Sequence, residues 1–242
     1  MLSVGTDQYQ NVWLGLDGGM AKVFHDPREK HYQCFSGKID SVYAVVYYNN
    51  DLYLGTNRGN MNIFILGFDP ISSAQQQCDA HVVKMILESG QMLSTAHRML
   101  DGILLRKLSK SGKRLINYWD HPTLDNVLYK SVHENHPCTK WTRTSVENYR
   151  WHFEHFIALG NEFEHRFNKQ HATILKLKSS LEQPPANIPR GPLTSFAQAM
   201  PDEFKSSSNP VFAYRRYYQS KQSKFKMRWT ARAVPDWFNS ES

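Results

Sequence analysis

A long amphipathic segment that begins at Cys78 constrains the fold of this chain more than any other feature. At about 100° per residue in an α-helix, five polar side chains fall within an arc of roughly 80°, and apolar side chains cover most of the rest. The five polar residues are His81, Lys84, Glu88, Gln91 and Thr95. Burying an imidazole, an ammonium and a carboxylate without partners costs about several kcal/mol. We therefore expect this polar row to face either a wet cleft or a satisfied network, and we place the candidate catalytic residues His81, Lys84, Glu88 and Gln91 there.

Charge is unevenly distributed along the 242 residues, of which 40% are hydrophobic. Residues 1–60 carry five Lys and Arg against six Asp and Glu, residues 61–189 carry fifteen against twelve, and residues 190–242 carry nine against four. A basic excess in the later part favours a polyanionic partner such as DNA, although a solvated basic surface would give the same composition.

Cysteine usage and hydropathy indicate a compartment. The three cysteines, Cys34, Cys78 and Cys138, form no CxxC pair, which argues against a disulfide framework and a structural zinc site. No stretch approaches the roughly 20 apolar residues of a membrane span, and the first residues lack a signal-peptide pattern. We expect a cytoplasmic protein with no membrane partner and no cofactor.

An internal repeat occupies the first 64 residues: NVWLGLDGGMAKVF at 11–24 recurs as DLYLGTNRGNMNIF at 51–64, with an offset of 40 positions. Strand, glycine-rich turn and returning strand predict a β-hairpin in each copy. The two copies resemble the short β-propeller repeats in sensor domains of bacterial hybrid two-component regulators. Two blades cannot close a ring that needs about four, so residues 1–60 are expected to form a small antiparallel, propeller-blade-like appendage.

Residues 61–242 are expected to form a mainly α-helical domain. Capping residues and apolar spacing predict helices over residues 73–100, over residues 137–169, and from residue 209 onward. Residues 106–126 are rich in Lys, Ser, Gly, Asn and Asp and are expected to form a basic loop. The change of style at MNIF also makes Met61 an alternative chain start.

His81 and Glu88 stand two turns apart on the expected helix, which leaves about 10 Å between their Cα atoms. A carboxyl group beside apolar neighbours can serve as an acid or base, and a nearby histidine can orient or relay. The alternative is an ordinary Lys84–Glu88 pair at i and i+4, worth a few tenths of a kcal/mol, beside a hydrogen-bonded core histidine. Both interpretations remain open from the sequence.

Four histidines could bind a metal as pairs at i and i+3, namely His133 with His136 and His152 with His155. No carboxylate-flanked metal motif accompanies them. We therefore expect capping or surface roles and assign no metal.

The segment AYRRYYQSKQSKFKMRW at 213–229 interleaves cations with aromatic rings. This combination suits phosphates and unstacked bases, and it is equally typical of an amphipathic helix whose tyrosines are buried. The candidate DNA-binding residues are Arg215, Arg216, Tyr217, Tyr218, Lys224, Lys226, Arg228 and Trp229.

The motif CDAHVVKMILESGQML resembles the first helix of the phage endonuclease V type pyrimidine-dimer DNA glycosylases, in which a histidine precedes the catalytic glutamate by seven residues. NHPCTKW, PDEF and YRRYY extend the likeness over residues 61–238. The same span is similar to phage-type proteins that begin MNIF and continue with CDxHVVKM, from which no activity carries over.

The glycosylase resemblance implies a compact helical fold and a hydrolase and lyase activity in DNA repair, in which an amine attacks the sugar of a damaged nucleotide and forms a Schiff base. Glu88 would be the acid and His81 would contact DNA near the lesion. Lys84 and Gln91 stand where the family places arginines.

The family uses its terminal amine, and Met1 lies 80 residues before His81. The amine would therefore come from a chain starting at Met61, or from Lys84. Two other functions stay open: a noncatalytic DNA-binding protein, and a propeller-fragment sensor or interaction module on residues 1–60.

Overall fold

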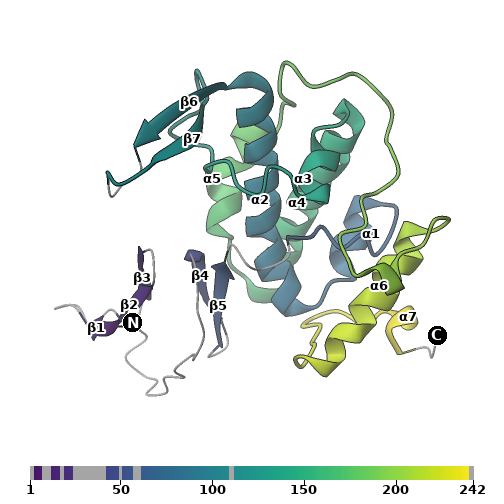
Figure 1. Ribbon diagram of the computed structural model, residues 1–242. Helices are drawn as coiled ribbons and strands as arrows, with labels where there is room; N and C mark the ends of the chain where they lie inside the picture. The colour runs from purple at the N-terminus through teal and green to yellow at the C-terminus, as the bar shows by residue number, and fades with distance from the viewer. Residues whose placement is uncertain are drawn as a thin grey trace. The chain divides into compact units, whose positions relative to one another are not determined.

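The computed structural model describes residues 61–108 and 112–239 in full and, within residues 1–60, the backbone of five strands. The chain divides into two compact units, Met1–Asn60 and Met61–Ser242. Each unit is described by itself (Figure 1).

The first unit contains short antiparallel strands. β1 (Ser3–Thr6), β2 (Val12–Leu16) and β3 (Gly19–Val23) form one sheet in that order, and β4 (Val42–Tyr48) pairs with β5 (Asp51–Thr56). The β2–β3 pair coincides with the first copy of the repeat. The returning strand expected over 61–64 is wrong, because this stretch forms no strand and is buried within the second unit. The propeller-blade likeness stays a prediction.

The second unit is mainly helical, as predicted. Its elements are α1 (Pro70–Gln75), α2 (Asp79–Asp101), β6 (Ile103–Leu108), β7 (Leu115–Asp120), α3 (Pro137–Thr142), α4 (Val146–Phe167), α5 (Ala172–Leu181), η1 (Asp202–Phe204), α6 (Pro210–Gln219), η2 (Ser220–Ser223) and α7 (Asp236–Asn239). Helices α2 and α4 lie side by side at its centre, α6 lies near the N-terminal end of α2, and the β6–β7 hairpin lies at the other end (Figure 1). Among the described residues, no helix has both the length and the apolar character needed to cross a bilayer.

The first predicted helix is broken into α1 and α2 at residues 76–78. Three backbone carbonyls at the break accept hydrogen bonds from distant side chains and not from the next helical turn. Arg166 donates to the carbonyl oxygens of Gln75 and Gln77, at 3.0 and 2.8 Å, and the Trp229 indole donates to that of Gln76 at 2.9 Å. The break therefore depends on tertiary partners that local sequence does not reveal.

The second predicted helix is also two helices. Its N-terminal piece, α3, begins at Pro137, as predicted, but ends at Thr142, and α4 starts afresh after Ser145. The Ser145 hydroxyl accepts from the Asn148 N–H at 3.2 Å and donates to the Pro192 carbonyl at 2.8 Å. A serine N-cap of this kind satisfies one of the unpaired N–H groups of the first turn. The third predicted helix, α6, begins as expected, with Asn209 as its N-cap.

The basic loop expected over 106–126 is wrong for much of its length, because β6 and β7 form an antiparallel hairpin whose register runs from Ile103↔Asp120 to Leu108↔Leu115. The buried guanidinium of Arg98, near the end of α2, binds the chain that leaves this hairpin. Its acceptors are the Asp125 carboxylate and the carbonyl oxygens of Trp119, Asp125, Leu128 and Tyr129. The hairpin is thus attached by one arginine whose partners lie 21 to 31 residues away.

Helix α5, which the sequence analysis did not predict, packs against both central helices at glycines. A Cβ built on Gly90 of α2 would come within 2.7 Å of Thr173, and one built on Gly160 of α4 would come within 2.7 Å of Ile174. The absence of a side chain at each glycine allows this close approach, at an expense of about 1 kcal/mol in helix propensity relative to alanine.

Candidate functional site

The polar row of α2 is mostly covered, and it is uneven along its length. His81 and Glu88 are buried, with 7% and 6% of their surface exposed, whereas about a third of the Lys84 side chain is exposed. Gln91 is half-buried, and the buried Thr95 hydroxyl donates to the Gln91 carbonyl at 2.8 Å. The ionisable residues of the row are therefore two buried side chains, His81 and Glu88, and between them the partly exposed Lys84.

Glu88 is a buried carboxyl group with a different partner on each oxygen. Its Oε1 lies 2.7 Å from Lys84 Nζ, one turn earlier on the same helix, and its Oε2 accepts from the backbone N–H of Asn62 at 3.1 Å. Burial raises the pKa of Glu88, and the nearby Lys84 ammonium offsets only part of that effect. A carboxyl group in this condition can hold a proton nearer to neutral pH and can act as an acid or a base.

The segment Met61–Leu66 lies against Glu88. Asn62 anchors it: its side-chain oxygen accepts from the N–H groups of Ile63 and Phe64, and its amide donates to the Ala199 carbonyl at 2.8 Å. Although Met61 was considered only as a chain start, its neighbour Asn62 is part of the site. No motif of the sequence indicates this contact, which spans 26 residues.

His81 is held by the C-terminal tail of the domain, which comprises α6 and the residues after it, 210–239. Its Nδ1 lies 2.7 Å from the Tyr218 hydroxyl, which itself accepts from the Cys78 N–H at 2.8 Å. The same Nδ1 lies 3.5 Å from Cys78 Sγ. Burial, together with the charges of Lys221 and Lys84, holds the pKa of His81 well below its usual range. His81 is therefore neutral at pH 7, and a neutral imidazole has one donor and one acceptor nitrogen.

Phe64 occupies a strained backbone position beside this histidine. Its φ is 52°, in the left-handed region that bulky residues rarely adopt. Its ring lies 4.6 Å from the His81 ring and 5.2 Å from the Tyr218 ring, between centroids. Strain of this kind persists only where the surroundings enforce it and is found at binding and catalytic sites more than elsewhere.

Lys221 joins the same cluster from the turn that follows α6. Its Nζ lies 4.2 Å from the centroid of the Tyr217 ring and 5.2 Å from that of Phe64. Burial lowers its pKa to about 8, and the charges of Lys224 and Lys84 act in the same direction. The sequence analysis did not select this residue as part of the site; it lies in η2, four residues after Tyr217.

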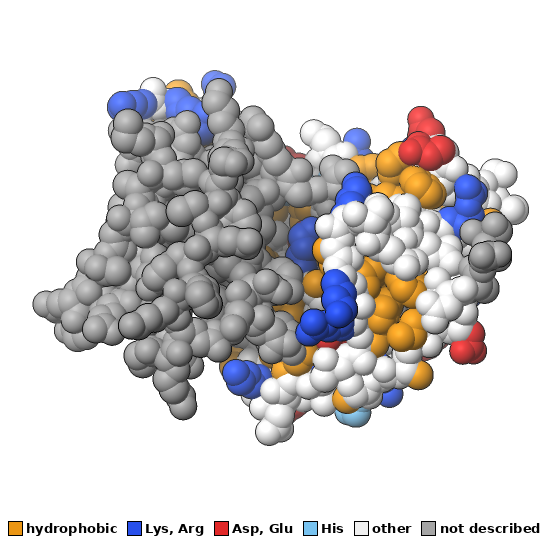
Figure 2. Space-filling model, turned by 90° about the horizontal axis from the view of Figure 1, so that it is seen from below, with side chains coloured by type: hydrophobic (Ala, Val, Ile, Leu, Met, Phe, Trp, Pro, Cys, Tyr) orange, Lys and Arg blue, Asp and Glu red, His pale blue; other side chains and the backbone are white. Residues whose placement is uncertain are grey.

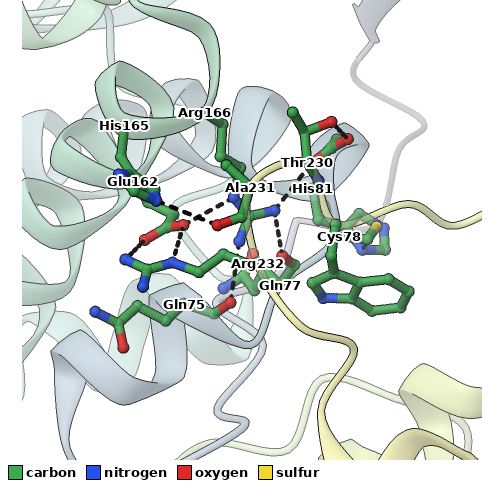
Figure 3. Close-up of polar contacts among 12 residues, drawn as sticks. Gln75, Gln77, Cys78, His81, Glu162, His165, Arg166, Thr230, Ala231 and Arg232 are labelled. Carbon is green, nitrogen blue, oxygen red and sulfur yellow. Dashed lines mark hydrogen bonds and ion pairs between the residues drawn. The ribbon is translucent and has the colours of Figure 1, made fainter.

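A buried ion network fixes the tail in place (Figure 3). Arg166 of α4 lies between Glu162, at 2.8 Å, and Asp79, at 3.0 Å, and its own side chain is fully buried. From the tail, Arg232 donates to both oxygens of Glu162, and Thr230 donates to Asp79 through its N–H and its hydroxyl. Burial opposes ionisation of Glu162, but the hydrogen bonds from Arg232 and Arg166 prevail and lower its pKa. This network attaches the tail to the N-terminal end of α2.

The predicted DNA-binding residues divide into two groups. Tyr217, Tyr218 and Trp229 are buried, so their rings serve the interior and are not available to stack on bases, which corrects the expectation for these three residues. Arg215 is half-buried and donates to the Leu66 carbonyl at 3.0 Å.

The remaining cations face outward: Lys224, Lys226 and Arg228 are exposed and Arg216 is half-buried. On the face shown in Figure 2, Lys and Arg side chains stand beside an apolar patch, and the acidic side chains in view lie mainly toward the edge. The described surface thus offers cations for phosphates but no exposed tyrosine in the tail.

Three of the four histidines considered as metal ligands form side-chain hydrogen bonds within the described residues. His136 caps α3 by accepting from the Cys138 N–H at 3.3 Å. Capping is one of the two roles that the sequence analysis expected. His152 and His155 are buried core residues, bonded to Thr142 at 2.8 Å and Gln77 at 3.2 Å.

A different cluster, His97, Asp101 and His121, has ligand atoms within 4.8 Å of one another. His121 Nδ1 accepts from the N–H groups of Thr123 and Leu124, at 3.3 and 3.1 Å. Its buried Nε2, which has no hydrogen-bond partner in the described part of the chain, therefore carries the proton of the neutral ring. A protonated nitrogen cannot bind a metal, so this cluster fits a hydrogen-bond acceptor such as water better than a cation.

Comparison with protein-family models, with curated proteins and with solved structures finds no match for this chain. The functional argument consequently depends on the geometry of the site itself.

Proposed function

We propose that the second unit is a DNA repair enzyme that acts on damaged DNA as a glycosylase and abasic-site lyase, through an amine and Glu88. The observation that supports this most directly is the environment of Glu88: a buried carboxyl group with a raised pKa, 2.7 Å from an amine and 3.1 Å from the backbone nitrogen of Asn62. Covalent catalysis at a sugar carbon needs an amine next to a group that can give and take protons.

The sequence suggested two amines for this role, Lys84 and the terminal amine of a chain that starts at Met61. Lys84 is in direct contact with Glu88 and is partly exposed. A chain that began at Met61 would carry its free amine one residue from the Asn62 nitrogen, which lies 3.1 Å from Glu88 Oε2.

The substrate would be held by charge. The tail cations Lys224, Lys226 and Arg228 are exposed, and each phosphate contact they make would release a counterion and weaken with salt. DNA is therefore the proposed partner, and a cytoplasmic location remains a prediction of the sequence.

Replacing Glu88 by Gln tests the proposal, with Glu154→Gln, an exposed position on α4, as the control. Wild-type and control protein should cut DNA that contains a pyrimidine dimer or an abasic site, and Glu88→Gln should bind the same DNA but cut it at least about 100-fold more slowly. Equal cutting by all three proteins would contradict the role of Glu88. Binding without cutting by the wild-type protein would favour the noncatalytic DNA-binding alternative.

A further inference from the structure

We propose that Lys221 is the amine of the full-length chain that forms the covalent bond with the substrate sugar. This inference rests on the proposed function and names a residue of the same site. Its basis is placement: the Lys221 ammonium lies on the rings of Tyr217 and Phe64, and Phe64 in turn lies against His81.

The surroundings of Lys221 favour the reactive form of an amine. The groups that act on it are Lys224 and Lys84, whose charges lower its pKa, and Cys78 and Glu88, which raise it. With burial as the largest contribution, the pKa falls to about 8, so about a tenth of the amine is unprotonated at pH 7. An unprotonated amine is the nucleophilic form.

Lys84 is less suited to the same role. Its Nζ lies 2.7 Å from Glu88 Oε1, so this nitrogen would have to leave the carboxyl group before it could reach a sugar carbon. Lys84 instead supplies a positive charge beside the carboxyl group, and Lys221 supplies the lone pair.

The reaction at an abasic site balances with these groups. Lys221 Nζ, as the neutral amine, forms a bond to C1′ of the ring-opened deoxyribose. The C1′ oxygen then leaves as water with one proton from Nζ and one from Glu88, which produces an iminium ion. The Glu88 carboxylate then removes a C2′ proton, the C3′–O3′ bond breaks, and its electron pair leaves with the phosphate oxygen. Water hydrolyses the remaining imine and returns the free amine.

Borohydride trapping tests the assignment, because hydride from the reagent reduces the iminium to a stable amine. Full-length wild-type protein, Lys221→Arg, Lys84→Arg and the control Lys178→Arg, which alters an exposed lysine of α5, are incubated with an abasic-site duplex and borohydride. Adducts are quantified and the modified peptide is identified by mass spectrometry, with folding checked by circular dichroism and DNA binding measured separately.

We expect Lys221→Arg to bind DNA, because the charge is kept. It should form at least about ten-fold less adduct than wild type, while the control forms as much adduct as wild type. The modified wild-type peptide should contain Lys221. An adduct on Lys84 or on another amine, or undiminished trapping by Lys221→Arg, would overturn this inference and leave the proposed function standing. Absence of any adduct from wild-type protein that binds the duplex would instead overturn the proposed covalent function.

Discussion

Replacing Arg166 by Met should destabilise the second unit more than any exposed charge change. The arginine side chain has no solvent exposure and donates to Glu162, Asp79 and two backbone carbonyls. Removing one partner of a buried ion pair typically costs roughly 3–5 kcal/mol, since the remaining charge stays buried. Glu162 retains Arg232 and Asp79 retains Thr230, so the lower end of that range is expected, about 3 kcal/mol.

Urea unfolding followed by the helical circular dichroism signal measures this loss. The matched control is Arg150→Met on the same helix, because Arg150 forms an exposed pair with Glu147 and such pairs contribute about 0.5 kcal/mol or less. Limited proteolysis at the tail cations should also become faster in Arg166→Met, since the network that holds the tail is broken. A loss below about 1 kcal/mol, or equal losses in both variants, would refute the argument from burial.

Three further predictions concern burial. Burial lowers the pKa of His97 to about 4 and that of His155 to about 3 from an ordinary value of 6.5. As pH falls below 6.5, these histidines take up protons in the unfolded chain before they do so in the folded chain. The free energy of unfolding, measured by urea titration, should therefore be lower at pH 5 than at pH 7 by roughly 2 kcal/mol for each histidine. Equal stability at both pH values would contradict this. Burial also raises the pKa of the Cys138 thiol to about 12, so peptide mapping after iodoacetamide treatment should show it modified only when the protein unfolds. Gly160→Ala should lower stability by up to roughly 2 kcal/mol, because the clash with Ile174 costs roughly 1–3 kcal/mol and the gain in helix propensity offsets about 1 kcal/mol. A gain in melting temperature would show that α5 moves away freely.

The elements that local sequence predicted are those whose signals are local. The apolar spacing of α2 and the Asn-Pro start of α6 are contained within one or two turns, and both helices are present. The break at residues 76–78 depends on Arg166 and Trp229, and the β6–β7 hairpin depends on Arg98, whose acceptors are many residues distant. The break at residues 143–145 depends on Ser145, which caps α4 and donates to the distant Pro192 carbonyl. The apolar spacing typical of a helix continues across both helix breaks, so this spacing does not reveal where a helix is interrupted.

The site shows the same division. His81, Lys84 and Glu88 could be selected because one helix places them in one row. Asn62 and Lys221 could not be assigned to the row from spacing, since they reach it from segments on either side of α2. The buried state of Tyr218 was one of two open alternatives, because an interleaved pattern of tyrosine and arginine fits an inward ring as well as a base-stacking ring.

The most direct test of the account is the single-turnover rate at which the full-length chain cuts an abasic-site duplex, measured for wild type and Glu88→Gln at saturating protein. The account predicts cutting by the wild-type chain and a rate at least about 100-fold lower in the variant, with saturation reached at the same protein concentration. A wild-type chain that saturates the duplex and leaves it intact would contradict the claim that the Glu88 site is chemically active.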